Sequence, residues 1–182
     1  MFCWHCAAVL PHQPPVVCES CRTPHWRDPK PCASALVTLD GRLMLVRRAR
    51  DPWRDFWDVP GGFCDPHEHP MDTAQREVRE ETGLEVAVVG LLGMWMDTYE
   101  GVANDSPPKT TLNIYFTGEP RGDMTARPDP DEVAELRWFG PDELPAKLAF
   151  PGHIPSVLAA WRLAYAVGGL YTPLYDRPVT LR

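Results

Sequence analysis

The alternation of apolar and polar positions predicts a sheet protein from about residue 30 onward. Two apolar runs of strand length, residues 33–39 and 43–46, flank the pair Asp40–Gly41, which is typical of a β-hairpin turn. Further extended segments rich in β-branched and aromatic residues are expected at 56–63, 85–96, 110–119 and 133–140.

Two segments have a helical pattern instead. In residues 70–82 the apolar residues Met71, Ala74 and Val78 recur at helical spacing, with a proline at the first position and a glycine after the last. Residues 155–167 predict an amphipathic C-terminal helix. Strands and helices do not alternate regularly, so the expected class is α+β with a mixed sheet.

The first 30 residues differ from the rest, because they are rich in cysteine, histidine and proline and lack a periodic apolar pattern. Eleven residues separate two CxxC pairs, and the four thiols are those of Cys3, Cys6, Cys18 and Cys21. Two pairs of thiolates can complete a tetrahedral zinc site whose binding energy folds a segment too small for its own core. The alternatives are two disulfides or unrelated thiols. We therefore expect a zinc ribbon at 1–30, a main domain at 31–170 and a C-terminal tail at 171–182.

Composition and charge limit the partners and the cellular location that we expect for the protein. A formal net charge of -7 and a pI near 5.3 argue against a general affinity for nucleic-acid backbones. The N-terminus lacks the basic and long apolar regions of a secretory signal, and no apolar run is long enough to span a bilayer. The expected location is the cytoplasm, which also favours zinc over disulfides in the cysteine-rich segment.

The candidate chemistry lies between Gly61 and Leu84. On a helix, Glu77, Glu80 and Glu81 share one face at spacings i, i+3 and i+4. Like charges at this spacing repel by about 0.2–0.5 kcal/mol per pair, whereas a bound Mg²⁺ or Mn²⁺ would make the cluster favourable. The glycine pair Gly61–Gly62 allows backbone to approach the same ion, and a nearby arginine can hold the carboxylates in place.

These residues resemble the box of the Nudix hydrolase family, G-x5-E-x7-R-E-U-x-E-E-x-G-U, where U is a bulky aliphatic residue. Every fixed position is matched, by Gly62, Glu68, Arg76, Glu77, Val78, Glu80, Glu81, Gly83 and Leu84. The resemblance implies an α/β/α sandwich with a mixed sheet. It also implies a Mg²⁺-dependent (or Mn²⁺-dependent) hydrolase in which water attacks the diphosphate bond of a nucleoside diphosphate derivative.

The resemblance also implies roles for individual residues. Glu77, Glu80, Glu81 and the Gly62 carbonyl would bind the metal, and Glu68 and Arg76 would orient that set. The general base stays open between Glu80 or Glu81 in the box and Glu132 or Glu135 in a distant loop. Candidates for substrate contact are Arg47, Arg48, Tyr99 and Glu135.

The N-terminal knuckles are similar to the zinc ribbon of NADH pyrophosphatases, but the SQPWPFPxS element expected for NADH is absent from the sequence. ADP-ribose, or a similar nucleotide sugar or dinucleotide, is therefore the first expectation. Alternatives are an NADH or dinucleoside-polyphosphate hydrolase, a diphosphate isomerase, and a nucleotide sensor whose ribbon contacts a partner. A small-molecule substrate is expected, without nucleic acid or membrane, and a homodimer is left open.

Overall fold

The architecture is built around one long central strand. The computed structural model describes residues 1–99, 108–168 and 172–173. Strand β3 (Lys30–Leu39) runs parallel to β8 (Lys109–Arg121) and antiparallel to β4 (Arg42–Arg48). On the β8 side the sheet continues through β7 (Glu85–Tyr99) to β10 (Thr172–Pro173), and on the β4 side it continues to β5 (Trp57–Asp58). Strand β6 (Gly61–Phe63) pairs with β3, and β9 (Val133–Phe139) pairs with β4.

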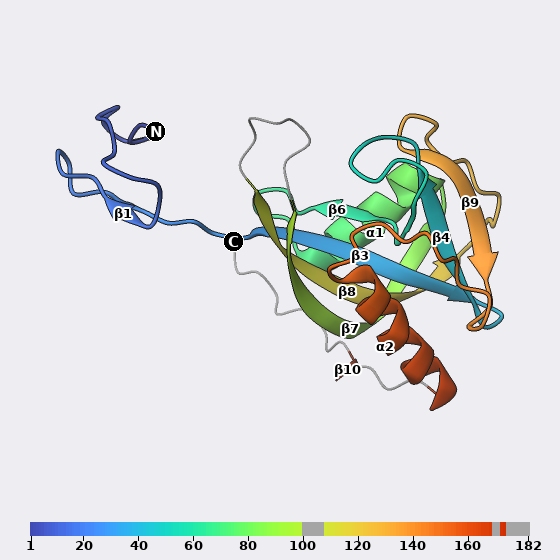
Figure 1. Cartoon of the computed structure of the whole chain (residues 1–182). Coiled ribbons are helices and arrows are strands. Elements are labelled where there is room, and N and C mark those ends of the chain that lie inside the picture. The colour runs from blue at the N-terminus through green and yellow to red at the C-terminus, as the bar shows by residue number, and fades with distance from the viewer. Residues whose placement is uncertain (100–107, 169–171, 174–182) are drawn as a thin grey trace.

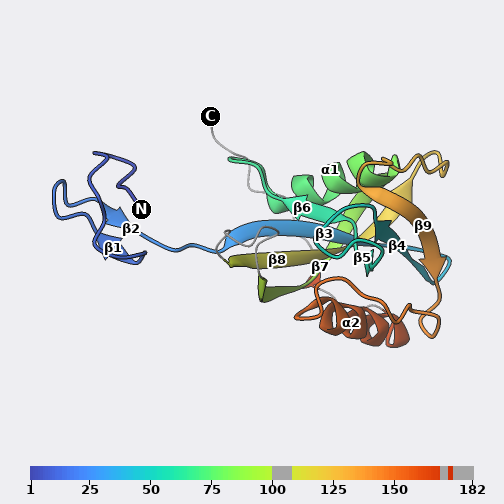
Figure 2. The same ribbon diagram turned by 45° about the horizontal axis from the view of Figure 1, so that its top comes forward.

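A helix covers each face of this mixed sheet, so the predicted α/β/α sandwich is confirmed (Figures 1 and 2). Helix α1 (Pro70–Thr82) has the predicted bounds because both ends carry strong local signals. The Met71 N–H donates to His69 Nδ1 at the start, and Gly83 ends the helix in the left-handed conformation with φ of 74°. Helix α2 (Ile154–Ala166) begins one residue earlier than the pattern predicted.

Alternation along the central strands divides the apolar side chains between two cores. Ala35 and Val37 of β3 pack on the α1 side, while Leu36 packs on the α2 side. The next strand repeats the pattern, because Leu43 and Leu45 face the α2 core and Met44 faces the α1 core. Successive strand residues point to opposite faces, so a single strand supplies both cores.

The N-terminal segment forms a separate small unit. Strands β1 (Val16–Val17) and β2 (Pro24–His25) pair antiparallel, and Cys3, Leu10, Val16 and Cys18 form a minimal core beside them. Figure 1 shows this unit at the end of an extended segment that leads directly into β3. Most of the predicted tail at 171–182 lies outside the described residues. Within the described part of the chain, neither helix is long and apolar enough to cross a membrane.

Two leucines of the β3–β4 hairpin test the core assignment. Leu45 is completely buried and Leu39 is 36% exposed. We expect Leu45→Ala to lower the free energy of unfolding by about 2–5 kcal/mol, because it leaves a cavity in the α2 core. The matched change Leu39→Ala should cost less than about 1 kcal/mol. Urea unfolding measures both, and equal losses would contradict this placement of the core.

Candidate active site

The glycine pair lets β6 approach two elements at once. Gly61 lies opposite Ser34 in the β3–β6 register, and a Cβ at Gly61 would overlap Ser34 Oγ. A Cβ at Gly62 would lie 2.5 Å from Oε1 of Glu77 on α1. A side chain at Gly61 would therefore push β6 away from β3, whereas a side chain at Gly62 would displace the end of the Glu77 side chain. The double glycine allows the strand to approach both elements closely.

Arg76 gathers the box carboxylates around one guanidinium group. It donates from Nε and Nη2 to the two oxygens of Glu68, at 2.9 Å each, and from Nη1 to Glu77 at 2.8 Å and Glu80 at 2.9 Å. The hydrogen bonds from Arg76, together with one from Thr73, lower the pKa of Glu68 to about 2. The paired hydrogen bonds to Glu68 thus hold the Arg76 guanidinium in the position from which it binds the other carboxylates.

Glu81 is the most deeply placed member of the cluster. Its side chain accepts a long hydrogen bond, 3.4 Å, from the Gly61 N–H. Burial raises the pKa of Glu81 well above its usual range, and the neighbouring charges of Asp58 and Glu77 raise it further. Burial likewise raises the pKa of Glu77. Mutually repelling carboxylates, one buried and one half-buried, beside a glycine backbone are a donor set that fits a hard divalent cation.

Asp58 was not singled out from the sequence. It is buried on β5, where its Oδ2 accepts from Arg48 Nη1 at 3.0 Å and its Oδ1 accepts from the Val59 N–H at 2.9 Å. Burial raises the pKa of Asp58, and its charge acts on Glu81. The sequence held one signal for it, an isolated acidic residue inside the apolar stretch before the glycine pair.

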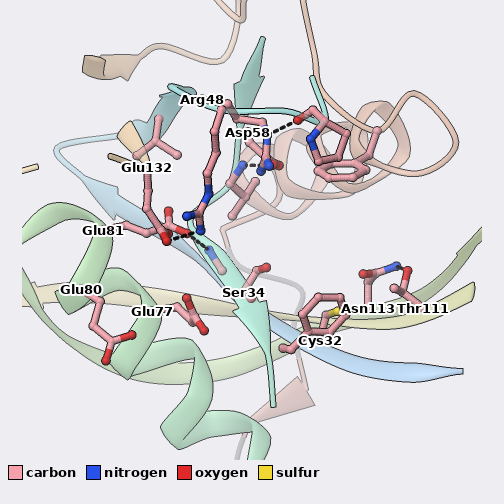
Figure 3. A pocket seen from close by; sticks show the side chains of 18 of the residues that line it. Cys32, Ser34, Arg48, Asp58, Glu77, Glu80, Glu81, Thr111, Asn113 and Glu132 are labelled. Carbon is pink, nitrogen blue, oxygen red and sulfur yellow. Dashed lines mark hydrogen bonds and ion pairs between the residues drawn. The ribbon is translucent and has the colours of Figure 1, made fainter. Parts of the chain in front are cut away.

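These groups open onto a cavity of about 760 Å³. Figure 3 shows its labelled glutamates, Glu77, Glu80, Glu81 and Glu132, on one side and Cys32, Thr111 and Asn113 on the other. Predicted site residues that line it are Gly62, Arg76, Glu77, Glu80, Glu81, Arg48, Tyr99 and Glu132. Three others, Glu68, Arg47 and Glu135, are absent from the lining that the described residues provide.

The last two of these residues face each other away from the cavity. Arg47 on β4 donates to Glu135 on the neighbouring β9 at 3.1 Å and to Asp55, in the turn before β5, at 2.7 Å. Glu135 also pairs with Arg137. By contrast, Glu132 lines the cavity, where it pairs with Arg50. Of the two loop glutamates between which the sequence could not decide, Glu132 shares the cavity with the box carboxylates and Glu135 does not line it.

Several lining residues are polar groups that sequence reasoning did not select. They occur within strands or at the start of α2, and they comprise Ser34, Lys109, Thr111, Asn113, Tyr115 and His153. Four of them, Ser34, Thr111, Asn113 and His153, are buried polar side chains. Polar residues inside otherwise apolar strands were the available signal, because a buried polar group requires a bonding partner or a ligand.

The four N-terminal thiols form a second cluster. Their Sγ atoms all lie within 4.8 Å of one another, with Cys3–Cys21 at 3.6 Å and Cys6–Cys18 at 3.7 Å. None is in a disulfide. Tetrahedral coordination with Zn–S bonds of about 2.3 Å places sulfur atoms about 3.8 Å apart, so the spacing fits zinc.

The two knuckles of this cluster have the same backbone geometry. In the first, the Ala7 N–H donates to the Cys3 carbonyl at 2.9 Å, and in the second, the Arg22 N–H donates to the Cys18 carbonyl at 2.9 Å. Ala7 and Arg22 both have positive φ, 59° and 63°. The same unusual backbone conformation in both knuckles supports the interpretation that they are two halves of one metal site.

Comparison with protein families gives one match over most of the chain. The family model described as "NUDIX domain" matches residues 28–159. The N-terminal cysteine knuckles lie outside the matched residues.

Curated relatives share this region at modest identity. A MutT-like protein of Streptomyces ambofaciens is 32% identical over 64% of this chain and 67% of its own length. An ADP-ribose pyrophosphatase of Methanocaldococcus jannaschii is 28% identical over 67% of this chain and 68% of its own length. An NAD-capped RNA hydrolase NudC of Vibrio parahaemolyticus is 27% identical over 70% of this chain but only 45% of its own length.

A solved structure agrees in fold along nearly the whole chain. A NUDIX hydrolase from Nitrosomonas europaea superposes with a TM-score of 0.73 and 24% identity, over 96% of both chains. At this identity the likeness concerns the fold alone.

The raised pKa of Glu81 predicts an effect on stability. A carboxyl whose pKa is higher in the folded than in the unfolded state binds more protons when folded, so stability falls as pH rises from the unfolded to the folded value. Without added divalent cation, Glu81→Gln should raise the Tm at pH 8 by about 2–8 °C and change it less at pH 4. The more exposed Glu80→Gln removes an ion-pair partner of Arg76 and is the control, for which no rise in Tm is expected. Differential scanning calorimetry at both pH values tests this, and a lower Tm for Glu81→Gln at pH 8 would contradict it.

Proposed function

The chain belongs to the Nudix hydrolase family, and on this premise we propose that it is a divalent-cation-dependent pyrophosphatase for a nucleoside diphosphate derivative. The substrate class that we propose is ADP-ribose or a similar nucleotide sugar or dinucleotide. The observation that carries the proposal is the carboxylate cluster on α1, supported by Glu68 and Arg76 and open to a large cavity.

The proposed metal ligands are Glu77, Glu80, Glu81 and the Gly62 carbonyl, with Mg²⁺ or Mn²⁺ as the ion. When bound, the ion supplies charge neutralisation for the diphosphate and acidifies the attacking water. The close packing of Gly62 on Glu77 and the burial of Glu81 support this donor set.

The chain's own residues divide the remaining tasks. Glu68 and Arg76 keep the carboxylates in position through their paired hydrogen bonds. Arg48 and Lys109 line the cavity and can contact phosphate oxygens. The proposed general base, which takes the proton of the attacking water, is Glu80, Glu81 or Glu132, because these three residues line the cavity. Glu135 is not chosen because it pairs with Arg47 outside the lining.

Similarity to an ADP-ribose pyrophosphatase supports the first substrate choice. Similarity to NAD-capped RNA hydrolases favours NAD-type dinucleotides as a second candidate. The similar region spans about half the length of those relatives. The missing SQPWPFPxS element weighs against that second candidate. A non-catalytic sensor is disfavoured because every carboxylate of the box is present.

We further propose that the four cysteines hold a structural zinc ion. The proposed division is a zinc ribbon at 1–30, the Nudix domain at 31–170 and the tail at 171–182. A site with four cysteine ligands leaves no open position for a substrate, so the ion would stabilise the N-terminal unit without taking part in hydrolysis.

Turnover of a substrate panel tests the enzymatic proposal. With Mg²⁺ we expect AMP and a phosphorylated product from ADP-ribose or a related compound, identified by mass spectrometry. Glu81→Gln should lower kcat by about 10²–10⁴-fold, because it removes a carboxylate proposed to bind the metal ion or to take the proton of the attacking water. The control Glu119→Gln, at an exposed position on β8, should keep wild-type activity. Hydrolysis of no compound in the panel, or full activity of Glu81→Gln, would refute the proposal.

Elemental analysis tests the zinc site. Protein purified without chelators should contain about one zinc ion per chain, because four thiolates form one closed site. Cys6→Ser should lose the metal and destabilise the N-terminal unit. Cys64→Ser, outside the cluster, should retain it. Protein without zinc, or equal zinc content in the two variants, would rule the site out.

A further inference from the structure

Three contacts restrain the side chain of Arg48 at the edge of the cavity. Its Nη1 donates to Asp58 Oδ2 at 3.0 Å, and its Nε donates to the Pro52 carbonyl at 2.8 Å (Figure 3). Its guanidinium carbon lies over the Phe150 ring, 5.2 Å from the ring centre. Arginine packs favourably on aromatic faces in this way. The hydrogen bonds therefore hold the edge of the guanidinium group while the ring supports its face.

These contacts leave most of the arginine donors free. A guanidinium group has five N–H donors. The Pro52 carbonyl accepts from Nε, and Asp58 accepts from one hydrogen on Nη1. Among the residues that the structure describes, no partner accepts from the second hydrogen on Nη1 or from the two on Nη2. Arg48 lines the cavity, so these donors are available to an anion bound there.

Phe150 has a backbone conformation that phenylalanine rarely adopts. Its φ is 45°, in the left-handed region, and the next residue is Pro151. This region is unfavourable for a bulky side chain, and a following proline restricts the backbone further. Strained residues persist only where the surrounding structure holds them, and they cluster at ligand sites. Phe150 lines the cavity, so the strain occurs at the site itself.

Strand β5 positions two of the three groups that contact Arg48. Asp58 is the last residue of this strand. The carbonyl of its neighbour Trp57 accepts from the Ala149 N–H at 2.8 Å, which attaches the segment before Phe150 to the same strand. The carboxylate and the ring around Arg48 therefore depend on one short strand.

The backbone after Phe150 is anchored on the opposite side. Its carbonyl accepts from the N–H groups of His153 at 3.0 Å and Ile154 at 3.1 Å, at the start of α2. His153 Nε2 lies 2.8 Å from Tyr115 Oη on β8, and His153 Nδ1 lies 2.8 Å from Asp97 Oδ2 on β7. Two neighbouring strands thus hold the first turn of α2, and with it the unusual backbone of Phe150.

Two further aromatic residues hold the Phe150 ring. The Tyr99 ring centre lies 5.3 Å away at an interplanar angle of 64°, and the Trp53 ring centre lies 6.4 Å away at 62°. Edge-to-face contacts of this kind are favourable. The ring is therefore kept against Arg48 by its neighbours as well as by its backbone.

We propose that Phe150 is a positioning residue, whose ring keeps the Arg48 guanidinium in the orientation in which its free donors bind the diphosphate of the substrate. The inference rests on the proposed function, because the diphosphate is the anion that the site would receive. Without the ring, the guanidinium could turn toward the carboxylates that line the same cavity, and its donors would be lost to the substrate. The alternative is that Phe150 only packs the start of α2.

A double-mutant cycle on ligand binding separates the two roles. We would measure the Kd of α,β-methylene-ADP, a nucleoside diphosphate that resists hydrolysis, by calorimetry with Mg²⁺. Arg48→Ala should weaken binding about 10–100-fold, and Phe150→Leu about tenfold. In the Arg48→Ala background, Phe150→Leu should change the Kd less than about twofold, because no guanidinium is left to position. Phe56→Leu is the matched control, since it removes a ring beside Lys147 outside the cavity lining and should leave the Kd unchanged.

Two conservative variants keep the proposal falsifiable if Arg48→Ala or Phe150→Leu does not fold. Phe150→Tyr keeps an aromatic face beneath Arg48 and should bind the probe within about twofold of the wild type. Phe150→Met keeps an apolar side chain without that face and should bind about tenfold more weakly. Thermal unfolding, measured alongside, shows which variants are folded.

Three results would each overturn the positioning role. They are an equal loss from Phe150→Leu in both backgrounds, equal binding by Phe150→Tyr and Phe150→Met, and no binding of the probe to the wild type. Failure to hydrolyse any compound of the substrate panel would refute the proposed function instead, and the Kd values would still decide this inference.

Discussion

Electrostatic repulsion within one turn of α1 is the constraint on which the rest of the site depends. Glu77 is half-buried and Glu81 is buried, so both carboxyl groups are partly shielded from water, and Asp58 adds another buried carboxyl group beside them. Arg76 offsets only some of this repulsion, through Glu68, Glu77 and Glu80. The strand that carries the glycine pair and the helix face that carries the glutamates together offer the donor set that the proposed cation would require.

Local signals explain how much could be predicted from the sequence. Helix α1 was placed to the residue because a proline and a glycine mark its ends, and the hairpin was placed by Asp40–Gly41. The box could be recognised because its metal-binding candidates lie within about one helix of one another in sequence. In each of these cases the interacting residues are neighbours in the chain.

The polar residues that line the cavity from distant parts of the chain could not be predicted in this way. Tyr115 and His153 are 38 residues apart, and they meet only because α2 begins over the face of β8. Ser34 lies beside Tyr115 because β3 and β8 pair in parallel, and the sequence contains no local marker of this pairing. The same reasoning explains Arg47 and Glu135, whose partnership across β4 and β9 removes both from the lining that was expected of them.

The contact between Gly62 and Glu77 has an evolutionary consequence. A methyl group at position 62 would lie 2.5 Å from the end of the Glu77 side chain, so the carboxylate would have to turn aside to make room for it. That turn would disturb the 2.8 Å ion pair between Glu77 and Arg76. A substitution at position 62 would therefore act on the box through the conformation of Glu77, and the two positions are coupled in evolution although neither carries the other's function.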